Sequence, residues 1–245
     1  MKDTTLDALR AARAAKNLTA VVTDLESGAE ALWIDGKGID GKEVDGNDPA
    51  DLGLAISDSV EAAVAEAARK DASQVVEDDS RRLFIRVFSP PQRLLIIGAV
   101  HVAQSLSAMA REAGYAVALI DPRDTWATPE RFPDIEIDRR WPDEALADLA
   151  IDRRTALVAL SHDPKLDEPA LSAALSSDAF YIGALGSRRT HARRLDRLRV
   201  SGFDDEQLSR IRGPVGLDIG AVSPAEIAVS ILAEITQQLR VPAPR

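Results

Sequence analysis

The chain has no cysteine among its 245 residues. It therefore offers no disulfide, thiolate metal site, thiol nucleophile or persulfide of its own. It also lacks any run approaching the roughly 18 apolar residues of a membrane-spanning helix. Its first residues, MKDTTLDALRAARAAKN, are charged and amphipathic, without the apolar centre of a secretory signal. These absences predict a cytoplasmic protein with no membrane contact.

Positive charge is also in short supply. The 30 Lys and Arg residues are outnumbered by 40 Asp and Glu residues, which gives a formal net charge of −10. Non-specific binding to nucleic acid draws its affinity from a basic face, so we expect no nucleic-acid partner. The apolar fraction of 45% is ordinary for a globular protein, and the length suits one large domain or two small ones.

The first part of the chain mixes helix and strand patterns. Helices are predicted at 4–16 and 55–70, and strands at 18–25, 29–34 and 82–88. Residues 35–53 are rich in Asp and Gly, which favour turns, and their spacing does not fit a calcium-binding EF-hand loop. We therefore expect a solvated loop there.

Paired prolines follow the strand predicted at 82–88. Ser89, Pro90 and Pro91 disfavour continuation of either kind of element and indicate a domain boundary. The chain is therefore expected to hold a smaller α+β N-terminal domain at 1–90 and a second domain at 91–245.

Strand and helix patterns alternate regularly after Pro91. The predicted strands are 94–97, 116–120, 135–137, 156–160 and 180–182. Such alternation is typical of a doubly wound parallel α/β sheet. The last predicted helix begins with a capping box of Ser223 and Glu226, with Pro224 at its first helical position. Isoleucines recur at every fourth position of this helix and should pack it on the sheet.

The stretch 93–121 has the order strand, turn, helix, strand of a dinucleotide-binding unit, with Asp121 about 20 residues beyond the turn. Asp121 is placed either to hold a ribose hydroxyl or to stabilise its own turn with Pro122. The second glycine of the usual fingerprint is replaced by Val100.

Ligands of open parallel sheets bind at the carboxyl ends of the strands. The residues that follow the predicted strands are therefore expected to face one crevice. In the stretch 183–189, glycines permit close backbone approach, and Ser187 with Arg188 can hold a phosphate at a helix start. The alternative is an ordinary strand–helix turn with solvated arginines.

The histidines allow more than one interpretation. His162, with Asp163 and Asp167 nearby, could serve a metal or an acid–base pair, but a structural role is the better expectation, and we predict no protein metal ligands. His101 either contacts a ligand or caps its turn. The chain has no G-x-S-x-G elbow and no Walker A sequence.

Several ordered motifs resemble those of the XdhC/CoxF-like family, the maturation factors of xanthine and carbon monoxide dehydrogenases. They are GAVHVA at 98–103, IDPR at 120–123, ERFP at 130–133, SHDPKLD at 161–167, YIGALGSRR at 181–189 and GPVGLDIGAVSPAEIAVSILAEI at 213–235. The resemblance covers essentially all of residues 93–240. It implies a small N-terminal domain followed by a Rossmann-like domain.

The resemblance also implies a function. Family members bind the finished molybdenum cofactor, as molybdopterin or its cytosine dinucleotide form, protect it, and deliver it to an apo-molybdoenzyme of the xanthine/CO dehydrogenase type. They also meet a cysteine desulfurase, and a homodimer is suggested. Such a chaperone catalyses no bond change itself. The residues expected to bind the cofactor are Gly98, His101, Asp121, Arg123, His162, Asp163, Gly183, Gly186, Ser187, Arg188, Gly216 and Asp218.

The chain departs from the family pattern in three places. Where the family usually reads Gly-Ala-Gly-His, the chain has Val100 as the third residue. The Cys-Gly-Gly stretch often found before the linker is replaced by VEDDSRRLF at 76–84, and a paired-glycine hairpin by the Asp-rich stretch 35–48. Two alternatives stand beside the chaperone. The first strand–helix–strand unit supports an NAD(P)-binding oxidoreductase, although Val100 counts against it, and the departures favour a divergent scaffold that has lost cofactor binding.

Overall fold

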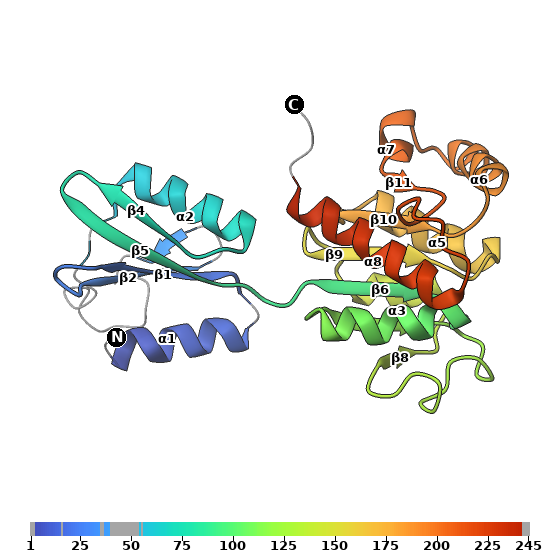
Figure 1. Cartoon of the computed structure of the whole chain (residues 1–245), viewed down its shortest axis with the longest axis horizontal. Helices are drawn as coiled ribbons and strands as arrows, with labels where there is room; N and C mark the ends of the chain where they lie inside the picture. The colour runs from blue at the N-terminus through green and yellow to red at the C-terminus, as the bar shows by residue number, and fades with distance from the viewer. Residues whose placement is uncertain (1–2, 16, 35–36, 40–53, 55, 242–245) are drawn as a thin grey trace. The chain divides into compact units, whose positions relative to one another are not determined.

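A computed structural model describes residues 3–15, 17–34, 37–39, 54 and 56–241. The chain divides into two compact units, residues 1–90 and 91–245 (Figure 1). That each unit folds as an independent domain stays a prediction.

The first unit is an antiparallel sheet with the strand order β3-β2-β1-β5-β4. Its strands are β1 (Thr19–Asp24), β2 (Glu30–Ile34), β3 (Lys37–Ile39), β4 (Gln74–Asp78) and β5 (Arg81–Phe88). Helix α2 (Asp58–Lys70) packs on the face that carries Ala20 and Val22, and α1 (Asp3–Ala14) on the face that carries Val21. The predicted α+β character is confirmed.

Two strands of this unit were not predicted. Lys37–Ile39 pair with β2 inside the stretch expected to be a loop; most of that stretch lies outside the described residues. β4 pairs with β5 at the other edge of the sheet. Its Val75 is half exposed, so the sequence of β4 does not show the apolar pattern of a buried strand. Both strands lie at sheet edges, where pairing with a neighbour rather than burial determines the structure.

The second unit is a parallel sheet with the strand order β11-β10-β9-β6-β7-β8. Its strands are β6 (Arg93–Ile97), β7 (Ala116–Ile120), β8 (Glu136–Asp138), β9 (Thr155–Ala159), β10 (Tyr181–Ala184) and β11 (Ile211–Arg212). Counted from β6, this is the 3-2-1-4-5-6 order of a Rossmann-like fold, with its switch point between β6 and β9. The predicted doubly wound sheet is confirmed, and β11 is an addition.

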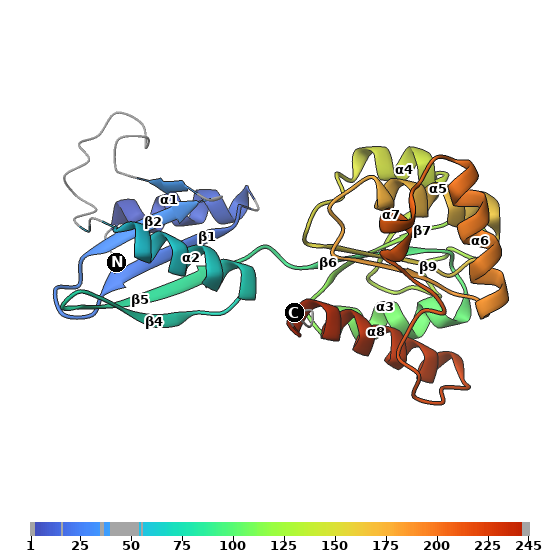
Figure 2. The ribbon, with the colours of Figure 1, turned by 90° about the horizontal axis from the view of Figure 1, so that it is seen from above.

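Helices cover both faces of this sheet (Figure 2). One face carries α3 (His101–Glu112) and α8 (Pro224–Arg240); the other carries α4 (Pro142–Asp148), α5 (Pro164–Leu175), α6 (Arg188–Val200) and α7 (Asp205–Ser209). Alternate residues of β6 serve the two cores, Leu94 and Ile96 on one side, Leu95 and Ile97 on the other. Burial on both faces explains why the strands read as continuous apolar runs. In the described part of the chain, no helix is long and apolar enough to cross a membrane.

The predicted capping box at the start of α8 is present. Ser223 Oγ accepts a hydrogen bond from Glu226 N, and Glu226 Oε2 accepts one from Ser223 N at 2.8 Å. Ile231 and Ile235 are fully buried against the sheet, as the four-residue repeat indicated. The box therefore fixes where α8 begins, and the isoleucine repeat determines which face packs on the sheet.

We predict that Ser223→Ala lowers the free energy of unfolding by about 1 kcal/mol, because the first-turn N–H groups of α8 lose their acceptor. Urea unfolding of the purified protein measures the change. Ser201→Ala is the matched control, since Ser201 is also exposed but lies at the end of α6. Equal effects of the two substitutions would contradict the capping role.

Candidate functional site

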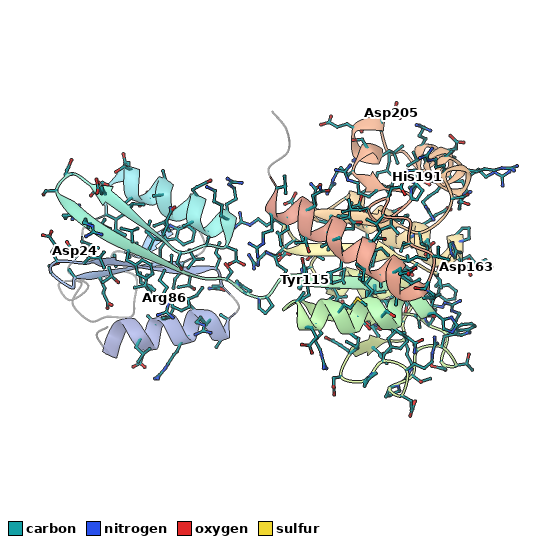
Figure 3. All side chains as sticks on the ribbon, viewed as in Figure 1. Asp24, Arg86, Tyr115, Asp163, His191 and Asp205 are labelled. Atoms are coloured by element: carbon teal, nitrogen blue, oxygen red, sulfur yellow. The ribbon has the colours of Figure 1, made fainter. Side chains whose placement is uncertain are left out.

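The polar residues predicted to bind a ligand lie in the turns that follow the parallel strands. We call these turns, at 98–101, 121–123, 161–163, 183–188 and 213–218, the carboxyl edge. Figure 3 labels Asp163, just after β9, at the end of the second unit opposite Tyr115, which precedes β7. The topology therefore brings all five turns to one end of the sheet.

The turn after β6 and the turn after β9, which meet at the switch point, are in direct contact. Gly98 has φ +101°, and a Cβ built on it would lie 2.8 Å from Ser161 Cβ and 2.9 Å from Ser161 N. No side chain fits there without displacing the backbone that follows β9. Gly98 is thus required by packing between the two halves of the sheet, whether or not a ligand also approaches it.

Asp121, the residue that follows β7, connects the turn after β6 to the end of β7. It is fully buried, and its Oδ2 accepts hydrogen bonds from Ala99 N at 2.6 Å and Arg123 Nη2 at 2.6 Å. Its Oδ1 accepts from Arg123 N at 2.9 Å and Arg123 Nε at 2.8 Å. The carboxylate is thereby occupied within the chain. This favours the second of its two predicted roles, stabilising a turn, over binding a ribose.

The pKa values of this pair follow from the same contacts. Burial is the largest influence on Asp121 and opposes ionisation, but the hydrogen bonds from Arg123 and from Ala99 N outweigh it and lower the pKa. The carboxylate in turn raises the pKa of Arg123. Asp163 and Asp167 also contribute to that increase, which shows that the guanidinium lies within electrostatic reach of the turn after β9.

Trp126 is a further residue near this edge that sequence patterns did not single out. The Arg123 and Arg131 guanidinium carbons each lie 5.5 Å from the centre of its ring, and the residue is 42% exposed. Gln104 of α3 exchanges hydrogen bonds with Arg131, at 3.2 and 3.4 Å. The segment after β7 is therefore fixed to α3 as well as to the first turn. The segment after β7 is polar, and its sequence contains no pattern that predicts these contacts.

The turn after β9 is built around Ser161. Its Oγ donates to Asp167 Oδ1 at 2.7 Å and accepts from Asp163 N at 3.0 Å. Asp163 caps α5 by accepting from Lys165 N, and His162 is exposed with φ +63°. In the described residues, no group of three or more His, Asp or Glu side chains could hold a metal ion.

The turn after β10 carries the features predicted for an anion site. Gly186 has φ +139°, and Ser187 Oγ caps α6 by accepting a hydrogen bond from Thr190 N at 3.1 Å. Arg188, the first residue of α6, is exposed. Gly183, by contrast, faces protein, because a Cβ there would lie 2.6 Å from Val215 Cγ2.

The turn after β11 is held by α8. A Cβ on Gly216, which has φ +95°, would lie 2.3 Å from Ser230 Oγ. Gly216 N donates to Glu234 Oε2 at 2.8 Å, and the buried hydroxyl of Tyr181 donates to the same oxygen at 2.5 Å. Glu234 was not predicted either, since the strongest pattern in α8 is the apolar repeat of its isoleucines. Asp218, beyond this anchor, is exposed.

The helix after the first turn begins with open N–H groups. Val100 is the N-cap of α3 and, as an apolar residue, provides no side-chain capping bond; His101, the first helical residue, is exposed. The start of α3 thus has donors and positive dipole available to an anion. Two cavities described by the structure, of about 420 and 270 Å³, lie away from these turns, beside α3 with Arg131 and beside β10 with Arg210.

The strand order and the polar carboxyl edge define a Rossmann-type domain. The family model described as the XdhC Rossmann domain matches residues 94–235, more than half of the chain, and the chain belongs to this family. The matched stretch includes all five turns of the carboxyl edge.

The chain is similar to curated proteins of the same kind. It is 36% identical over 148 residues to the molybdenum cofactor insertion chaperone PaoD of Escherichia coli K12, covering 60% of this chain and 40% of that protein. It is 34% identical over 161 residues to a probable xanthine dehydrogenase subunit of Bacillus subtilis 168, covering 65% and 47%. The chain thus spans less than half the length of either relative.

A solved structure shares the fold. It is that of a Bacillus halodurans protein described as a xanthine dehydrogenase, with a TM-score of 0.72 and 24% identity over 97% of this chain and 67% of that one. At this identity the likeness supports the fold alone.

We predict that Asp121→Asn lowers the free energy of unfolding at pH 7 by about 1–3 kcal/mol, because the buried amide cannot accept all the hydrogen bonds that Ala99 N and Arg123 donate to the carboxylate. Because the folded-state pKa lies below 3.8, the difference from wild type should be complete above that pH and disappear as pH falls through the lowered value. Urea unfolding across this pH range measures it.

Asp138→Asn is the control for this prediction. Asp138 accepts bonds from the backbone and guanidinium of Arg140 in the same local arrangement, but that pair is more exposed. Its loss should cost less than about 1 kcal/mol. If the two variants behave alike, Asp121 does not support the first turn.

Proposed function

We propose that this chain binds the molybdenum cofactor as cargo and delivers it to an apo-molybdoenzyme of the xanthine/CO dehydrogenase type. The proposal is carried by the family match, which runs through every turn of the carboxyl edge, and by similarity to a protein named a molybdenum cofactor insertion chaperone. The chain itself changes no bond of the cargo. It acts by binding, shielding and release.

The residues of the carboxyl edge suit such a cargo. The open start of α3 and the start of α6 with Arg188 offer N–H groups and positive charge to a phosphate. Because Gly186 has no side chain, the backbone there can approach such a phosphate closely. Asp163, which is partly exposed, and Asp218, which is exposed, suit the donor-rich edge of a pterin. We propose molybdopterin or its cytosine dinucleotide as the form bound.

The remaining site residues take supporting roles in this proposal. Gly98, Asp121, Gly183 and Gly216 shape the turns, as their contacts within the chain indicate. His101, Arg123 and His162 line the same edge and are proposed as cargo contacts. A cysteine desulfurase is proposed as a partner on the family resemblance, and the chain, which has no cysteine, can carry no persulfide of its own. A homodimer is proposed on the family resemblance alone.

One observation favours a second function, an NAD(P)-dependent oxidoreductase, since the strand order is that of dinucleotide-binding domains. The state of Asp121 weighs against it. The acid that would hold the ribose diol is buried and already bonded to Ala99 and Arg123. We therefore place this function second, and a scaffold without ligand third.

Anaerobic purification from a host that makes molybdopterin tests the proposal. Released pterin is oxidised and measured by fluorescence, and NAD(P) is titrated into the same preparation. Retained pterin, with weak or no NAD(P) binding, is the expected result. Tight NAD(P) binding without pterin would favour the oxidoreductase, and retention of neither would favour the scaffold.

We predict that Arg188→Ala reduces pterin retention about tenfold or more, because a charge-assisted bond to phosphate contributes about 1.5–3 kcal/mol. Arg153→Ala removes the same charge from an exposed residue in the turn before β9, at the opposite edge, and should leave retention unchanged. Equal retention by the two variants would move the phosphate away from α6. Ser187 is left intact because its loss would also uncap the helix.

We predict that Val100→Gly raises affinity for the pterin cargo, because removal of the side chain opens the first turn to a phosphate. Val100 packs partly against the core beside α3, so the free energy of unfolding should fall by roughly 1 kcal/mol. Pterin retention and thermal unfolding are measured on the same variant. A lower melting temperature with unchanged retention would exclude this turn from the site.

A further inference from the structure

Two oppositely charged side chains are buried beneath the carboxyl edge, between α5 and α6. Asp167 is 2% exposed and Arg194 3% exposed, and Arg194 Nη2 lies 3.7 Å from Asp167 Oδ2. This distance is longer than the roughly 3.2 Å limit of an ordinary N–H···O hydrogen bond. The two charges therefore attract each other without a direct bond.

The guanidinium of Arg194 is only partly satisfied. Its Nη2 donates to the Leu185 carbonyl at 2.9 Å, whereas its Nη1 is buried without a hydrogen-bond partner in the described part of the chain. Asp167 makes more hydrogen bonds, since its Oδ1 accepts one from N and one from Oγ of Ser161. The chain thus buries a cation and leaves one of its strongest donors unused, which is costly unless something else compensates it.

The ionisation behaviour points the same way. Burial raises the pKa of Asp167 despite the nearby guanidinium, and burial lowers the pKa of Arg194. Both directions indicate that the surroundings do not fully compensate either charge.

The pair is in contact with two turns of the carboxyl edge. Ser161, bonded to Asp167, packs against Gly98 of the first turn. Leu185, bonded to Arg194, leads through Gly186 into the start of α6, and a Cβ on Gly186 would lie 3.9 Å from Arg194 Nη2. The guanidinium therefore stands behind the turn that presents the N–H groups of α6.

We propose that Arg194 is a positioning residue for an oxyanion, such as a phosphate group, held at the start of α6. Its bond to Leu185 fixes the turn that aims the helix N–H groups, and its partly compensated charge strengthens their attraction for the anion. Asp167 holds the guanidinium in place, and the bound anion completes the compensation that Asp167 provides only in part. The inference rests on the proposed function only in that a pterin cofactor carries such a phosphate.

A purely structural pair is the alternative, and the two roles predict different results. Apolar or neutral residues often replace a buried charge pair without loss of stability. The double variant Asp167→Asn with Arg194→Met should therefore unfold at a temperature close to that of wild type and yet bind anions weakly. A purely structural pair would leave the anion affinity of this double variant unchanged, whatever the change in its stability.

The test is calorimetric titration of the full chain with inorganic pyrophosphate at low ionic strength, where charge interactions are least screened. Arg194→Met should weaken binding about tenfold or more, and Arg194→Lys, which keeps the charge, should recover most of the affinity. Arg193→Met is the matched control, because Arg193 is the exposed neighbour on the same helix. It should change affinity less than about twofold, as expected for a solvated charge.

If Arg194→Met fails to fold, the double variant carries the test. Pyrophosphate affinity equal to wild type in either variant overturns the inference, as does an equal loss in Arg193→Met. Absence of pyrophosphate binding by the wild-type chain also overturns it. Pterin retention is measured separately, so a chain that retains pterin without binding pyrophosphate would reject this inference and leave the proposed function in place.

Discussion

The contact between Gly98 and Ser161 is the constraint on which the carboxyl edge depends. The two residues lie just after the neighbouring strands β6 and β9, where the halves of the sheet diverge. Because Gly98 has no side chain, the two backbones approach until a Cβ would overlap Ser161. From this contact the bonds spread outward, through Asp121 to the segment after β7 and through Asp167 to Arg194 and α6.

Polar residues of the edge divide into those that build it and those that remain available. The carboxylates of Asp121, Asp167 and Glu234 each accept a hydrogen bond from the backbone N–H of a turn at this edge. His101, Arg188 and Asp218 are exposed and free of such duties in the described structure. A sequence motif combines the two kinds, and the binding proposed at this edge needs both. Substitution of a residue that builds the edge would therefore lower binding as much as substitution of a residue that contacts the ligand. Only the first kind of substitution would also lower the free energy of unfolding.

Features that depend on local sequence were predictable. The apolar runs of β6, β7 and β9 and the capping box of α8 arise from neighbouring residues, and the strand–helix alternation then leads to the doubly wound sheet. Contacts that join distant segments were not predictable. Arg194 meets Asp167, and Glu234 meets Tyr181 and Gly216, only after the chain folds. β4 was missed for a related reason, because pairing with β5 defines it rather than burial.

The glycines show the same limit. Gly98, Gly183 and Gly216 are predicted from sequence to lie where a ligand nears the backbone, and the structure shows protein atoms at each of them. Packing alone accounts for these three positions. Gly186 differs, because its hypothetical Cβ meets only nearby side chains of the following helix. The pattern of glycines in sequence therefore marks close approaches without telling which partner makes them.

The buried carboxylate of Asp121 has a thermodynamic consequence. It holds the turn after β6 by bonds within the chain, so this turn keeps its shape without help from a ligand. A turn that is already ordered loses little conformational entropy when a ligand binds, so more of the contact energy appears as affinity. Substitutions that make this turn more mobile would weaken binding through an entropic cost, even where the substituted residue does not touch the ligand.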